Sequence, residues 1–78
     1  MQNLDRELLK NRLGAIKAKT GITYRQLSEK TGIAQSTIGA YMVGRRVPEL
    51  ENAFLLAQVL GVSMNWLCGM DKLKGVQE

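Results

Sequence analysis

The chain has 78 residues, 45% of them apolar, which allows one globular domain with a modest core and leaves no room for a second domain. With no histidine and the single cysteine Cys68, the sequence excludes an internal disulfide and a zinc site built from Cys and His, and we expect no metal or other cofactor. The net charge is +4, with nine basic and two acidic side chains in residues 6–46, so this half of the chain would attract phosphate.

The first predicted helix covers residues 4–19 and ends before Gly21. Its apolar residues recur at i, i+4 and i+7, the spacing of one buried helix face: Leu9, Leu13 and Ile16. Lys10 and Lys17 lie off this face. We interpret Lys10 as solvated, whereas for Lys17 both a solvated position and a contact with nucleic-acid phosphate stay open.

The second predicted helix covers residues 24–30 and follows Thr23, whose hydroxyl can accept a hydrogen bond from the open N–H groups of the first turn. Gly32 can adopt the left-handed conformation that ends a helix, and Ile33 can then fold back onto the core. A third helix follows at once. Two short helices joined by a tight turn containing glycine are typical of a helix-turn-helix unit.

The third predicted helix begins at Ala34 or Gln35 and has two different faces. One is apolar and faces the core: Ile38, Tyr41 and Met42. The other consists of small or uncharged residues: Ser36, Gly39, Ala40 and Val43. Because a solvated helix face normally carries charge, this second face indicates a surface that approaches another molecule closely.

The loop after the third helix carries Arg45 and Arg46 side by side, and Pro48 fixes the entry to the next helix. From this loop the two arginines could reach a DNA backbone, and we favour such a contact for at least one of them. The alternatives are ion pairs with Glu49 or Glu51, or simple exposure to solvent.

The fourth predicted helix covers residues 49–60 and ends at Gly61. Its apolar residues follow a helical spacing and predict the buried stripe: Leu50, Ala53, Phe54, Ala57 and Leu60. Further apolar side chains widen this stripe. We therefore expect most of the fourth helix to be buried and to support the second and third helices.

The fifth predicted helix covers residues 64–68 and follows Ser63, another good N-cap. Its end of the chain offers more apolar surface than one short helix can bury, and two interpretations stay open. In one interpretation these side chains cover the base of the core. In the other they form a self-complementary dimer patch: Met64, Leu67, Cys68 and Met70. Residues 71–78 form a polar tail.

Residues 23–48, with flanks from about 9 to 68, resemble the lambda-repressor-like helix-turn-helix family of phage repressors, Cro proteins and small bacterial regulators. The resemblance lies in a pattern of single residues followed by a short run, Leu-Gly-Val-Ser at 60–63. The single residues are Leu27, Gly32, Ile33, Ile38, Gly44 and Pro48. The run Gln35-Ser36-x-x-Gly39-Ala40 is similar to the recognition helix of lambda repressor. Three positions depart from the family pattern. Ala34 stands where the family often has Ser or Thr, Met42 where it often has Glu, and Val43 where it often has Asn.

The resemblance implies an all-α fold, a compact bundle of five short helices in residues 1–70, with the helix-turn-helix formed by the second and third. It also implies a sequence-specific DNA-binding transcriptional regulator, of the phage repressor type, that inserts the third helix into the major groove. The base-reading residues would be Gln35, Ser36, Gly39 and Ala40. The phosphate-binding residues would be Thr23, Tyr24, Arg25, Thr37, Arg45 and Arg46.

Two of these assignments have alternatives. The amide of Gln35 matches the donor and acceptor of adenine N6 and N7, but Gln35 could instead cap the third helix. Tyr24 could be a half-buried packing residue. Because one bidentate base contact discriminates by only ~1–3 kcal/mol, we expect a homodimer, at least on double-stranded DNA, that binds a two-fold operator.

The chain is too short to include the C-terminal dimerisation and self-cleavage domain of large phage repressors, so either the fifth helix dimerises, or the chain is a fragment or a stand-alone regulator. A protein antirepressor or inducer is a further expected partner. The alternative function, from another class, is a protein-binding antirepressor or antitoxin-like module that uses the same uncharged face.

No nucleophile elbow, paired-carboxylate pattern or phosphate-binding glycine loop is present, so we expect no enzyme. No apolar run is long enough to span a membrane, and the N-terminal sequence MQNLDRELLK lacks the core of a signal peptide. A lone cysteine suits a reducing compartment, and we expect a cytoplasmic protein.

Overall fold

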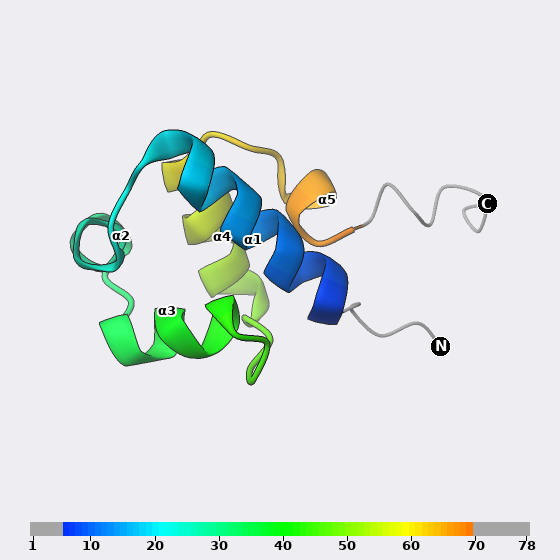
Figure 1. Ribbon diagram of the computed structural model, residues 1–78, viewed down its shortest axis with the longest axis horizontal. Helices are drawn as coiled ribbons and strands as arrows, with labels where there is room; N and C mark the ends of the chain where they lie inside the picture. Colours follow the sequence, from blue (N-terminus) through cyan, green and yellow to red (C-terminus); the bar gives the residue numbers. More distant parts are fainter. Residues whose placement is uncertain (1–5, 70–78) are drawn as a thin grey trace.

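The computed structural model describes residues 6–69, and the secondary structure in that range is entirely helical (Figure 1). The described residues form α1 (Arg6–Thr20), α2 (Tyr24–Thr31), α3 (Gln35–Met42), α4 (Leu50–Leu60) and α5 (Met64–Leu67). The prediction of an all-α bundle of five short helices is confirmed for this range. Residues 4 and 5 of the first predicted helix, Met70 and the predicted tail lie outside the described residues.

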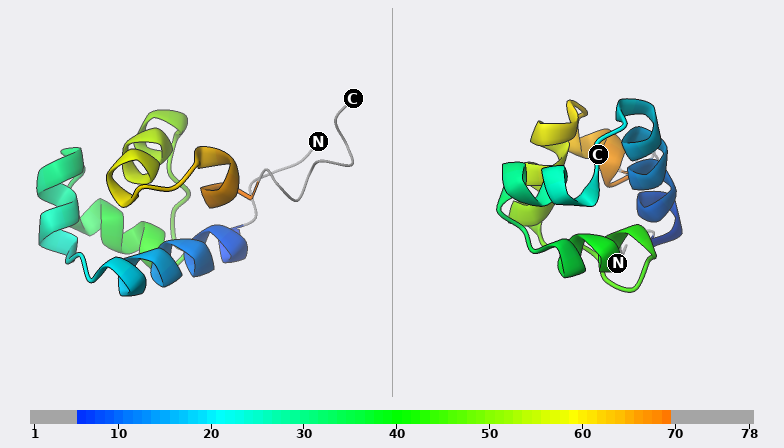
Figure 2. Two further views of the ribbon diagram at one scale, coloured as in Figure 1. Left: turned by 90° about the horizontal axis from the view of Figure 1, so that it is seen from above. Right: turned by 60° about the vertical axis from the view of Figure 1, so that its left-hand side comes forward.

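The helices are arranged so that α3 lies at an outer edge of the molecule, along the bottom of Figure 1 and of the right-hand view of Figure 2. α2 and α5 lie at opposite ends, with α1 and α4 between them. The backbone of α3 runs beside α1 and α2, whereas α4 lies against α1, α2 and α5. Side chains connect α4 to α3: Asn52 Nδ2 donates a hydrogen bond of 2.9 Å to the Tyr41 hydroxyl, and both helices contribute to one core. The expectation that the fourth helix supports the second and third is therefore confirmed.

The core takes at least one fully buried side chain from every described helix: Leu9, Leu13, Leu27, Ile38, Tyr41, Leu56 and Leu67. Fully burying one such side chain contributes about 1.5–3 kcal/mol. Leu9 and Leu13 of the predicted first face and Ile38 and Tyr41 of the predicted third face are confirmed by this set, whereas Ile16 and Met42 are half-buried and pack against it. No described helix is both long enough and apolar enough to cross a membrane.

The buried face of α4 differs from the prediction, because Leu50 and Phe54 remain 77% and 51% exposed. Ala53, Ala57 and Leu60 are buried as predicted, and Leu56 joins them, which gives a face with the i, i+3, i+4, i+7 spacing. Apolar residues are so dense in α4 that periodicity alone does not choose between the two faces. Packing against α2 and α5 selects the face that contains Leu56.

The turn between α2 and α3 is built as the sequence predicts. Gly32 ends α2 with a left-handed backbone (φ 81°) and donates its N–H to the carbonyl of Ser28, and Ile33 is buried. The hydroxyl of Thr31 adds a connection that the sequence pattern did not indicate. It donates to the carbonyl of Leu27 at 2.7 Å and accepts from the N–H of Ile33 at 3.1 Å. One buried side chain therefore joins the end of α2 to the turn that follows it.

α5 is attached to α1 through Arg12. Its guanidinium carbon lies 4.8 Å from the centre of the Trp66 ring, and its Nη1 donates a hydrogen bond to the Trp66 carbonyl. Ser63 caps α5 by accepting from the N–H of Trp66 at 3.0 Å, which confirms it as an N-cap. α5 is therefore docked by polar contacts as well as by the buried side chain of Leu67.

Candidate nucleic-acid interface

The exposed side of α3 forms a surface that we call the outer strip, made of Gln35, Ser36, Gly39 and Val43. Val43 and the two polar residues are exposed, Gly39 is half-buried, and α3 contains no charged side chain. Within the described residues, the side chains of Gln35 and Ser36 make no hydrogen bond. The outer strip therefore offers an amide, a hydroxyl and little bulk to whatever molecule lies against it.

Ala40 does not belong to the outer strip, and its predicted place on that face was wrong. Only 9% of its surface is exposed. The carbonyl of Ala40 accepts hydrogen bonds from the N–H groups of Arg45 and Arg46, at 2.9 and 3.3 Å. In this structure Ala40 holds the arginine loop through its carbonyl.

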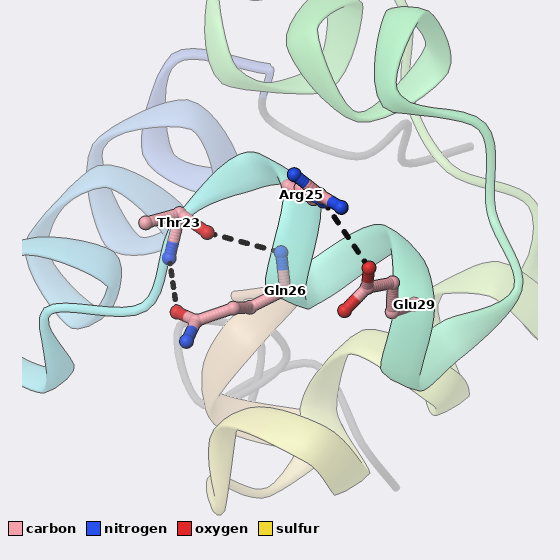
Figure 3. Close-up of polar contacts among 4 residues, drawn as sticks. All are labelled: Thr23, Arg25, Gln26 and Glu29. Carbon is pink, nitrogen blue, oxygen red and sulfur yellow. Dashed lines mark hydrogen bonds and ion pairs between the residues drawn. The ribbon is translucent and has the colours of Figure 1, made fainter.

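Both helices of the unit present open N–H groups at their starts. α3 begins after Ala34, and no side chain caps it, so the alternative that Gln35 serves as the cap is wrong for this structure. In α2 the hydroxyl of Thr23 accepts from the N–H of Gln26, and the Gln26 side chain accepts from the N–H of Thr23 (Figure 3). The predicted cap at Thr23 is confirmed. The N–H groups of Tyr24 and Arg25 stay available, at the positive end of the helix dipole.

The basic residues around the outer strip differ in how they are held. Arg45 and Arg46 are exposed, and neither pairs with Glu49 or Glu51. Arg25 instead forms an ion pair of 3.3 Å with Glu29, one turn further along α2 (Figure 3). Such an exposed pair contributes only about 0.3–0.5 kcal/mol, so a phosphate group could replace Glu29 at little cost.

Tyr24 lies where α1, α2 and α3 meet. Its ring is 38% exposed, the Nζ of Lys17 lies 4.8 Å from the ring centre, and a Cβ on Gly39 would lie 4.0 Å from Tyr24 Cε2. The side chain is thus both a packing residue and an exposed one. The aromatic contact of Lys17 is a feature that the sequence pattern did not indicate.

The predicted dimer patch on the fifth helix is wrong for Leu67, which is fully buried. Met64 is half-buried and packs on the core, and Cys68 is also half-buried. The described part of this surface therefore covers the base of the core. Burial raises the pKa of the Cys68 thiol, which keeps it protonated and unreactive near neutral pH.

The comparisons with known proteins agree with this arrangement. The sequence profile of the helix-turn-helix family matches residues 3–67. An uncharacterised HTH-type transcriptional regulator of Bacillus subtilis (strain 168), YobD, is 34% identical over 59 residues, which are 76% of this chain and 53% of that protein. The chain thus spans about half the length of the curated relative that it matches. No solved structure matches the chain.

Proposed function

The chain belongs to the lambda-repressor-like helix-turn-helix family, and from this membership and the outer strip we propose that it is a DNA-binding transcriptional regulator. The observation that carries the proposal is the outer strip itself, which is uncharged, largely exposed and flanked by Arg45 and Arg46, neither of which has a carboxylate partner among the described residues. A surface of this kind suits the floor of the major groove between two phosphate backbones. The proposal places the protein in the cytoplasm with its DNA and assigns it no catalytic activity.

In the proposed complex, the outer strip reads the bases. Gln35 pairs with adenine through its amide, and Ser36 donates to or accepts from a neighbouring base edge or a bridging water. Gly39 lets the helix backbone approach the base pairs closely, because it has no side chain. Ala40 takes no part, since it is buried.

The phosphate contacts hold α3 in register on the DNA. Tyr24 and Arg25 present side chains and open N–H groups at the start of α2, where Thr23 adds its hydroxyl, and Thr37 presents a hydroxyl and an N–H group near the start of α3. The exposed side chains of Arg45 and Arg46 approach the backbone beyond the other end of α3. These contacts raise affinity for every sequence alike.

The operator in this proposal has two-fold symmetry and is bound by two copies of the chain, in the manner of a phage-type repressor. One α3 makes few base contacts, and a single correct bidentate pair discriminates by only ~1–3 kcal/mol. Two copies on half-sites roughly 10 bp apart would double the number of bases that are read.

The decisive experiment is selection of operator DNA from a random-sequence pool, followed by titration of Gln35→Ala with each single-base variant. We expect preference to relax at one position, with the dependence of affinity on salt nearly unchanged. Gln58→Ala, at an exposed glutamine of α4, is the matched control and should keep the preference. Unchanged base preference in Gln35→Ala would show that another residue is the reader.

A second candidate function is an antirepressor or antitoxin-like module that holds another protein. The exposed apolar side chain of Val43 in the otherwise small outer strip favours it. Titration with mixed genomic DNA at two salt concentrations separates the two functions. Salt-sensitive binding is expected of the regulator, and no binding at either concentration is expected of the protein-binding module.

A further inference from the structure

Lys17 is held by an aromatic ring, whereas two other cations of the described chain are held by carboxylates. Lys10, seven residues earlier in α1, pairs with Glu7 at 3.2 Å, and Arg25 pairs with Glu29 at 3.3 Å. Within residues 6–69 Lys17 has no carboxylate partner, and its ammonium lies over the ring of Tyr24 at 4.8 Å from the centroid. An aromatic ring orients a cation without neutralising it, so Lys17 keeps its full charge in a defined position.

The ring of Tyr24 lies between the ammonium group of Lys17 and α3. Its Cε2 atom lies 4.0 Å from where a Cβ of Gly39 would be, in the middle of the outer strip. Tyr24 also starts α2, where its own N–H group is open. A cation from α1, an open N–H group and the uncharged middle of α3 therefore meet around one half-exposed ring.

We propose that Lys17 is a phosphate-binding residue of the DNA complex and that the ring of Tyr24 is its positioning residue. This inference rests on the proposed function and extends its surface from α2 and α3 to α1. The ring holds the flexible lysine near its bound orientation before DNA arrives, which lowers the entropy lost on binding. Because no carboxylate has to be displaced, the contact forms without breaking an ion pair.

The first test measures affinity for duplex DNA at several salt concentrations. Lys17→Gln should lower the slope of log affinity against log salt by about 0.9, and by the same amount on operator and on unrelated DNA. Lys19→Gln is the matched control, since Lys19 lies in the same helical turn, is exposed and has no aromatic partner. A slope that Lys17→Gln leaves unchanged, while the unaltered protein binds DNA, would overturn this inference alone.

The second test isolates the ring from the hydroxyl of Tyr24. Tyr24→Phe keeps the contact with Lys17, whereas Tyr24→Leu removes it, so only Tyr24→Leu should abolish the upfield ring-current shift of the Lys17 side-chain protons in the free protein. In DNA binding, the effects of Lys17→Gln and Tyr24→Leu should be non-additive. Additive effects would overturn the positioning role, and failure of the unaltered protein to bind any DNA would overturn both this inference and the proposed function.

Discussion

Substitution of Gly39 by alanine should raise the stability of the domain and lower its affinity for DNA. The variant therefore separates the contribution of Gly39 to folding from its contribution to binding. Gly39 lies in the interior of the helix and is not among the glycines with positive φ. An added Cβ would meet Tyr24 Cε2 at 4.0 Å, an ordinary van der Waals contact. Nothing in the described chain therefore requires a glycine at this position.

The expected gain in stability follows from helix propensity. Alanine is favoured over glycine in a helix interior by about 0.8–1.0 kcal/mol. In a domain of this size, that change raises the midpoint of thermal unfolding by about 4–8 °C, measured by circular dichroism. Gly14→Ala is the control for stability, since Gly14 lies within α1 with nothing within 4 Å of its missing Cβ. Both variants should gain by similar amounts.

The expected loss in DNA binding comes from the added methyl group at a tightly packed contact. Overpacking by one such group typically costs about 1–3 kcal/mol, a roughly 5–150-fold loss of affinity for the operator. A DNA titration of Gly39→Ala at constant salt measures it. A variant that melts at a higher temperature and binds DNA unchanged would refute the close approach of α3, and a lower melting temperature would refute the reasoning from helix propensity.

Three further predictions concern single side chains. Arg45→Ala should weaken binding to all DNA sequences alike and lower the salt slope by about one unit, and a loss confined to one sequence would contradict a phosphate contact. Thr31→Val should lower the free energy of unfolding in urea by about 1–3 kcal/mol, because the buried N–H of Ile33 loses its acceptor. An unchanged free energy would show that the hydroxyl does not hold the turn. Leu50→Gln should change the free energy of unfolding by less than about 0.5 kcal/mol, whereas Leu56→Ala should lower it by about 2–5 kcal/mol. A similar loss of stability in both variants would contradict the exposed position of Leu50.

The limits of α2 and the turn after it could be predicted because the signals are local. Thr23 acts on the N–H of a residue three positions away, and Gly32 adopts its left-handed backbone without help from distant residues. The inner faces of α1 and α3 were also predictable, since each contains one clear apolar stripe. Such features depend on a few neighbours in the chain.

The features that were missed depend on residues far apart in the sequence. The choice between Leu50 and Leu56 as a core residue is made by packing partners of α4, not by its own periodicity. The hydrogen bonds from the loop after α3 to the Ala40 carbonyl require a loop path that the residue pattern does not specify. The contact between Lys17 and Tyr24 requires α1 and α2 to be placed relative to each other, which no local signal determines.

The docking of α5 through Arg12 has a practical consequence. Trp66 is the only tryptophan of the chain, so its fluorescence comes from a single indole in contact with α1. Among the described helices, the backbone of α5 runs beside α1 and α4 and not beside α2 or α3. The emission of Trp66 therefore reports the assembly of the domain from a place remote from the outer strip. It can follow folding in a sample in which DNA binding is followed by a separate signal.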